Sequence, residues 1–226
     1  MSILNNDLKL IKIINKYIKN DKKLNIIFNH HNQKYSLEEL LKPIIVILKT
    51  GISFRNISNY TSIYWNTIYK FYQKLCKYDV FNKVQQKTIS NYLALTVNNL
   101  KNKKITYLLY TDTTLIPNKL GDELTAYNPQ LKKHKSTKIS IITDMFCNPI
   151  STKISASNFY DSNIFKTHLY DLQKEQPVLF NSNNILFADA AYDSSVLKKF
   201  INESNLGELI TPFLIIKTMF LLLKRQ

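Results

Sequence analysis

The sequence predicts an α/β (α+β) chain in which an N-terminal helical module precedes a domain built on a mixed sheet. Between residues 35 and 85, apolar residues recur at helical spacing. The later runs 105–111 and 185–188 are instead continuously apolar and rich in β-branched or aromatic residues, as buried strands are. Each run leads into an aspartate, Asp112 or Asp189. Acids that end neighbouring buried strands emerge together at a sheet edge, where they can share a hard cation.

Composition limits the classes of protein to which the chain can belong. Its 226 residues are 45% hydrophobic and 12% aromatic, which excludes global disorder and suffices for a core. The net charge of +15 and the pI of about 9.6 point to a polyanionic partner, most simply nucleic acid, although a merely solubilising surface is the alternative. Nearly all of this positive charge is lysine, in a composition also rich in Ile and Asn, which is typical of an A+T-rich genome.

The spacing of the cysteines and histidines, and the length of the apolar segments, bear on whether the chain is a metal-binding, disulfide-rich or membrane protein. The two cysteines are far apart, and the four histidines show no ligand spacing, so neither a zinc site nor a disulfide framework is indicated. No apolar stretch is long enough to span a bilayer. We therefore expect a soluble intracellular protein without a membrane partner, in a bacterial cytoplasm or at a site of viral DNA replication.

The helical module at residues 35–85 has the layout of a helix-turn-helix. Residues 1–34 predict one marginal helix and a linker. Ser36 and Glu39 form a capping box that opens a helix ending at Gly51, and two further helices follow, Phe54 to Tyr60 and Ile63 to Leu75. The outward face of the last helix would carry the DNA contacts Tyr64, Asn66, Thr67, Lys70 and Lys74. A small dimerisation module is the alternative.

The second half of the chain predicts a ribonuclease-H-like order of elements. Residues 86–104 are predicted as a helix and a basic connector. The expected elements after the strand at 105–111 are strands 138–143 and 150–155, a helix at 162–172, strand 185–188, a helix at 194–202 and a strand at 209–213. Three strands that pair antiparallel, a helix, a strand and a helix give the ribonuclease-H-like sequence of elements.

Over residues 35–205 the chain resembles the DDE transposases of bacterial insertion sequences, in the group called insertion sequence four and five. The matching motifs, in order, are Thr111-Asp112-Thr113-Thr114, the Lys-rich run leading to Lys138, Thr143-Asp144, Ser157-Asn158 with Asp161-Ser162, and Ala188-Asp189 with Tyr192-Asp193-Ser194. The resemblance implies a ribonuclease-H-like catalytic domain over residues 105–213, behind the helix-turn-helix. It also implies an activity, which is DNA cleavage and strand transfer at the ends of the element.

The resemblance further implies a set of site residues and partners. Three acids in this family hold two divalent cations, Mg²⁺ or Mn²⁺, and Asp112 and Asp189 match the first and second acid. Asp161 would lie near the site without binding metal, and Lys138 would offer charge to the DNA backbone. The partners implied are double-stranded DNA, as element ends and as target, and a second copy of the chain in a homo-oligomer.

The third acid of the family, a glutamate on a later helix, has no clear counterpart. From residue 214 the sequence is monotonously apolar, so we expect a domain that is incomplete at its C-terminus, followed by an aberrant tail at 214–226. Glu203 and Glu208 are left as substitutes for the third acid. The main hypothesis is a transposase impaired by this loss. The alternatives are an inactive DNA-binding relic that represses transposition, another two-metal nuclease of this fold, and aspartates that merely cap helices or form turns.

Overall fold

The computed structural model describes residues 5–29, 34–99, 106–118, 121, 123–128 and 134–212. The chain forms two compact units, Met1–Ile89 and Ser90–Gln226. The predicted tail at 214–226, and residues 129–133 of the Lys-rich run, lie outside the described residues. In the described part of the chain, no helix has the length and apolar character needed to cross a membrane.

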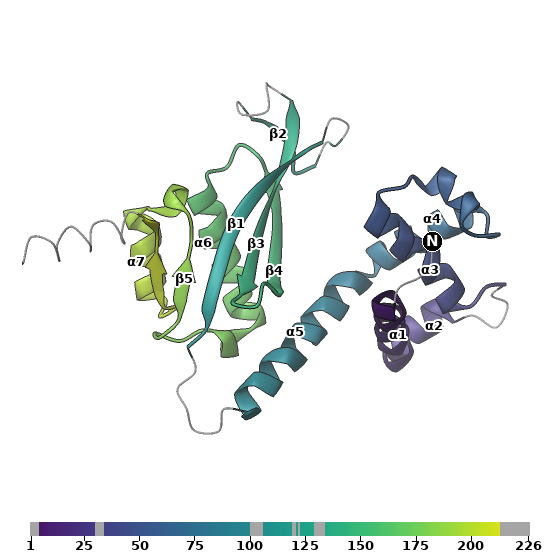
Figure 1. Ribbon diagram of the computed structural model, residues 1–226, viewed down its shortest axis with the longest axis horizontal. Coiled ribbons are helices and arrows are strands. Elements are labelled where there is room, and N and C mark those ends of the chain that lie inside the picture. Colours follow the sequence, from purple (N-terminus) through teal and green to yellow (C-terminus); the bar gives the residue numbers. More distant parts are fainter. Residues whose placement is uncertain are drawn as a thin grey trace, which may run out of the picture. The chain divides into compact units, whose positions relative to one another are not determined.

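The first unit is helical, as the sequence predicted. Its elements are α1 (Asn5–Asn20), α2 (Lys22–Phe28), α3 (Leu37–Thr50), the 3₁₀ helix η1 (Phe54–Asn59), α4 (Trp65–Lys77) and the first half of α5 (Val80–Asn99) (Figure 1). The predicted capping box at the start of α3 is confirmed, because Ser36 N donates to the Glu39 carboxylate at 2.8 Å and Glu39 N donates back to Ser36 Oγ at 3.3 Å. Gly51 ends α3 with a φ of +70°, which favours glycine.

The first helices belong to the core of this unit. Residues 5–28, for which the sequence predicted one marginal helix and a linker, form two helices. Ile11, Ile14 and Ile18 of α1 are buried in the same apolar cluster as α3 and α4. Their spacing places them on one face of α1, and an apolar face of this kind gains stability only when another element covers it. The elements predicted to form a helix-turn-helix therefore share one core with α1 and α2.

The second unit contains a mixed sheet. Its strands are β1 (Leu108–Pro117), β2 (Ala126–Tyr127), β3 (Lys135–Asp144), β4 (Pro149–Ala156), β5 (Ile185–Phe187) and β6 (Glu208–Ile210). Its helices are α6 (Asp161–Glu175) and α7 (Ser195–Glu203), with 3₁₀ turns η3 (Pro177–Leu179) and η4 (Ala190–Tyr192). The main strand order is β4-β3-β1-β5-β6, and the short β2 pairs with the start of β3. β3 pairs antiparallel with β1 and β4, whereas β5 pairs parallel with β1 and β6. This is the ribonuclease-H-like fold that the sequence predicted.

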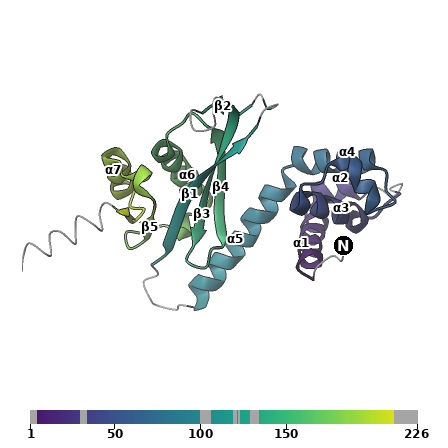
Figure 2. The same ribbon diagram turned by 45° about the horizontal axis from the view of Figure 1, so that its top comes forward.

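Helix α6 packs on one face of this sheet (Figure 2). His168 of α6 is buried there, and its two ring nitrogens lie 3.0 Å from Ser140 Oγ of β3 and 2.9 Å from Ser151 Oγ of β4. Burial and the nearby Lys153 ammonium lower the pKa of His168 to about 4. The neutral imidazole therefore joins α6 to two strands of the sheet.

Candidate active site

Asp112 lies in the middle of β1, not at the strand end that the sequence predicted. β1 continues to Pro117 because β3 pairs with it along its whole second half, and Asp112 lies opposite Ile141. On the other side of β1, the pairing with β5 ends at Tyr110. Asp112 therefore follows the point where β1 loses one of its two neighbours. Its side chain is exposed, on the face of β1 opposite to the buried Thr111.

Asp189 follows β5 and begins the turn η4. Its backbone is still extended, and the preceding Ala188 N donates to Ile210 O of β6. One oxygen of the Asp189 carboxylate accepts a hydrogen bond from Ala191 N. Asp189 therefore does form a turn, which was one of the interpretations of its sequence position. This hydrogen bond also fixes the position of its exposed carboxylate.

The pairing of β1 with β5 sets the level of the two acids. Tyr110 pairs with Phe187 across these parallel strands, and their rings stack with centroids 4.9 Å apart and planes 13° apart. Asp112 and Asp189 each lie two residues further along. Because residues two apart on extended chain share a face, we expect both acids to project from the face of the stacked rings, just beyond the last paired residues Tyr110 and Phe187.

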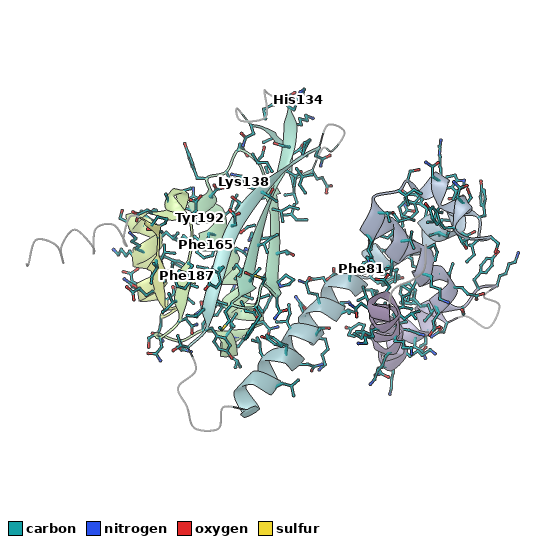
Figure 3. All side chains as sticks on the ribbon, viewed as in Figure 1. Phe81, His134, Lys138, Phe165, Phe187 and Tyr192 are labelled. Atoms are coloured by element: carbon teal, nitrogen blue, oxygen red, sulfur yellow. The ribbon has the colours of Figure 1, made fainter. Side chains whose placement is uncertain are left out.

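Tyr192, three residues after Asp189, lies on the side of the sheet that carries α6. Its side chain is 1% exposed, and its ring packs edge-on against Phe165 of α6 at 5.4 Å (Figure 3). Burial raises the pKa of Tyr192 to about 12, and the negative charges of Asp161 and Asp112 add to the effect. From the sequence, Tyr192 was only part of a motif, because no local pattern predicts that its side chain packs under the sheet against α6.

Lys138, which was predicted to offer its charge to the DNA backbone, has its partners within the second unit. The residue is 8% exposed, and its ammonium donates to Asp161 Oδ1 at 2.6 Å and to Phe159 O at 2.9 Å. The alternation of side chains along β3 places Lys138 on the inner face with the buried Ser140. Its charge is therefore neutralised within the unit. Asp161, the first residue of α6, is its partner and lies close enough to Tyr192 to raise the pKa of that phenol.

Helix α4 exposes most of the predicted DNA-contacting residues. Tyr64, Thr67 and Lys70 are exposed, and Asn66 is half-buried. Gln73 and Lys77, for which no DNA contact was predicted, are also exposed. Lys70, Gln73 and Lys77 follow one another at spacings of three and four, so they form a stripe along one side of the helix.

Lys74 departs from the predicted face of α4. Its ammonium donates to Ile27 O of α2 at 2.6 Å and lies over the Phe28 ring, 5.1 Å from the centroid. The side chain is half-buried. The Lys74 ammonium, which the sequence assigned to DNA, is therefore bound by α2, a helix that the sequence did not predict as part of this core.

Neither glutamate left open as the third acid lies beside the two aspartates. Glu208 pairs with Ile185 at the start of the parallel strands β5 and β6. Ile185 precedes Asp189 by four residues, and four residues of extended chain span about 13 Å. Glu203 is in the last turn of α7 and lies 3.7 Å from the Lys199 ammonium. Among the described residues, no group of three His, Cys, Asp or Glu side chains is placed to hold a metal ion.

No protein-family model and no curated protein matches the chain. Its fold is similar to solved transposase structures at low sequence identity. The piggyBac transposase synaptic complex with hairpin DNA has a TM-score of 0.48 and 14% identity, over 91% of this chain and 50% of that one. The Mos1 transposase paired-end complex with the left transposon end has a TM-score of 0.32 and 10% identity, over 86% of this chain and 64% of that one. A pre-cleavage Mos1 transpososome has a TM-score of 0.33 and 9% identity, over 80% of this chain and 61% of that one. The chain thus spans half to about two thirds of these proteins.

Proposed function

We propose that the chain is a DNA transposase of an insertion sequence, in which the first unit binds element ends and the second unit presents Asp112 and Asp189 to phosphodiester bonds. The main support for the proposal is the register of β1 and β5. Tyr110 and Phe187 pair across these parallel strands, and Asp112 and Asp189 each follow two residues later, which supports a shared site. The order of the sequence motifs and the ribonuclease-H-like sheet support the same function.

The two aspartates fit a divalent cation. Both are exposed carboxylates on extended chain, and Mg²⁺ and Mn²⁺ prefer oxygen ligands of this kind. Asp112 and Asp189 would hold the cation, which when bound stabilises charge on the phosphate oxygens and activates the attacking water or hydroxyl. The chain itself supplies rigidity, since β3 pairs with β1 through Asp112 and the Ala191 amide holds Asp189.

The first unit supplies the duplex contacts. The exposed side of α4 presents Tyr64, Thr67 and Lys70, and Lys77 extends the stripe toward the end of the helix. Hydroxyl and ammonium groups on one side of a helix can reach base edges and phosphates in a major groove. The net charge of +15 adds long-range attraction to DNA.

A second candidate function is DNA binding without cleavage, which would repress transposition by intact copies. The separation of the chain into two units favours it, because the α4 stripe belongs to Met1–Ile89 and both acids belong to Ser90–Gln226. Binding by the first unit therefore does not need the acids.

One experiment separates these functions. Binding to duplex DNA is measured over a series of salt concentrations, and nicking of a supercoiled plasmid is followed with Mg²⁺ or Mn²⁺, for the natural chain and for Asp112→Ala and Asp189→Ala. Nicking that both substitutions abolish supports the transposase. Salt-dependent binding without nicking supports the repressor. If DNA binding is absent, both functions are excluded.

A further inference from the structure

Helix α1 carries a row of lysines along the side that faces away from the core of the first unit. Its apolar face, with Ile11, Ile14 and Ile18, is buried in the same cluster as α3. Successive lysines of the row are three, four and three residues apart, so they share one face of the helix, which lies opposite to these isoleucines. These four exposed residues, the α1 lysine stripe, are Lys9, Lys12, Lys16 and Lys19.

The α1 lysine stripe has no acidic partner in the part of the chain that the structure describes. None of its four ammonium groups takes part there in an ion pair or a side-chain hydrogen bond. Asp7 is the one acid of α1, and it pairs with Lys49 of α3 at 2.9 Å. The positive charges of the stripe are therefore exposed, close together and not balanced by a carboxylate of α1.

Lysines of the second unit do have partners within it. Four of them pair with a carboxylate, namely Lys138, Lys153, Lys198 and Lys199. Two more place the ammonium over an aromatic ring, namely Lys166 and Lys174. A lysine-rich composition affects both units alike. It therefore explains the number of lysines on α1, but not their lack of partners.

The length of the α1 lysine stripe fits the backbone of duplex DNA. Lys19 follows Lys9 by ten residues, which is about 15 Å along a helix axis. One strand of a duplex presents a phosphate about every 3.4 Å of its axis, so about four phosphates occupy the same length. An anionic membrane suits the stripe less well, because the apolar face that such a helix would insert is buried in the core.

The α1 lysine stripe and the stripe of α4 are separate surfaces. Helix α3 packs against both α1 and α4 (Figure 1). Each of these two helices buries its apolar side in the core that it shares with α3, so its exposed lysines point away from that core. The first unit therefore presents two basic surfaces, one on each helix.

We propose that the α1 lysine stripe binds the phosphate backbone of a second duplex segment while α4 holds the first. The inference rests on the proposed function and adds a second DNA partner for the same unit. Lysine contacts phosphates as a point charge, and contacts to phosphates carry no sequence information directly. The second duplex should therefore be bound whatever its sequence, and the full chain should hold two duplexes together.

The test measures this bridging with the full chain. A duplex is fixed to beads, the chain is bound to it, and the capture of a second, fluorescent duplex of unrelated sequence is followed over a series of salt concentrations. We expect the double variant Lys12→Gln/Lys16→Gln to lower the capture affinity about tenfold or more and the salt slope by about two, one for each lost phosphate contact. The variant should still bind the bead duplex through α4.

The matched control is Lys174→Gln/Lys199→Gln, which removes the same charge from two exposed positions of the second unit and should leave capture intact. Thermal melting verifies that both variants fold. Capture that survives Lys12→Gln/Lys16→Gln, or that falls equally in the control, overturns the inference alone. So does a natural chain that binds the bead duplex without capturing the second, or that binds phosphatidylserine vesicles through these lysines instead. Absence of binding to any duplex overturns the proposed function as well.

Discussion

Tyr110 of β1 and Phe187 of β5 stack with their ring centroids 4.9 Å apart, two residues before Asp112 and Asp189. Strand register is decided by such pairs, because a shift of one residue moves every side chain to the other face of the sheet. β5 is only three residues long, so this contact is a large part of what aligns it with β1. If the two acids form one site, their alignment depends on this contact.

Replacing Phe187 by Ala should therefore weaken both the fold and the site. We expect the free energy of unfolding of the second unit to fall by about 1–3 kcal/mol, from lost burial and lost ring contact. Denaturant unfolding measures this loss, and Mn²⁺ affinity should fall in the same variant although both acids remain. Phe146→Ala, which removes an exposed ring, should change neither quantity by much. Unchanged stability in Phe187→Ala would show that the stack does not align the strands.

Among the lysines of α4, we expect Lys70 and Lys77 to contact DNA and Lys74 to stabilise the fold. Lys70→Ala and Lys77→Ala should each weaken binding to all duplex sequences and lower the slope of log affinity against log salt by about one, the value for one lost phosphate contact. Lys74→Ala should leave this slope unchanged, because its ammonium binds Ile27 O. It should instead lower the stability of the first unit by about 1.5–3 kcal/mol. A reduced salt slope in Lys74→Ala would place this ammonium on the DNA.

Replacing Lys138 distinguishes a structural role from a DNA contact in the second unit, as replacing Lys74 does in the first. Lys138→Met leaves the Asp161 carboxylate without the partner at 2.6 Å, so we expect a loss of about 1.5–3 kcal/mol in denaturant unfolding. The slope of DNA affinity against salt should stay the same. The opposite pattern, a lower slope with unchanged stability, would mean that Lys138 leaves Asp161 to bind a phosphate.

His168 should make stability depend on pH. Its pKa is lowered to about 4 in the folded state, against an ordinary value near 6.5, so between these values the unfolded chain binds the extra proton. Stability should therefore be complete above about pH 6.5 and fall as the pH drops toward 4, by up to about 1.4 kcal/mol per pH unit. His168→Gln should flatten this dependence, and His134→Gln, at an exposed position, should preserve it. Thermal melting between pH 4 and 8 measures both.

Local patterns in the sequence predicted most elements, and long-range contacts explain the differences. The Ser36–Glu39 capping box, the glycine after α3 and the apolar runs were sufficient for the element order, because each depends on residues close in the chain. The end of the first strand was misplaced, because pairing with β3 carries β1 past Asp112. The sequence also gave no indication of the partners of Lys138 and Lys74. These partners, Asp161 and Ile27, are 23 and 47 residues away, and no local pattern reveals them.

If Asp112 and Asp189 form one divalent-cation site, Mn²⁺ binding should depend on both acids. Electron paramagnetic resonance counts free Mn²⁺ during a titration of the natural chain, Asp112→Asn and Asp189→Asn, with Asp171→Asn as the control. Asp171 is an exposed acid of α6 that pairs with Lys153. We expect each of the first two substitutions to weaken Mn²⁺ binding by about tenfold or more, the scale on which the loss of about 1.4 kcal/mol of ligand interaction appears. The double variant should bind Mn²⁺ more weakly than either single variant, because both ligands of the one ion are then lost. Full Mn²⁺ affinity in either single variant would contradict a shared site.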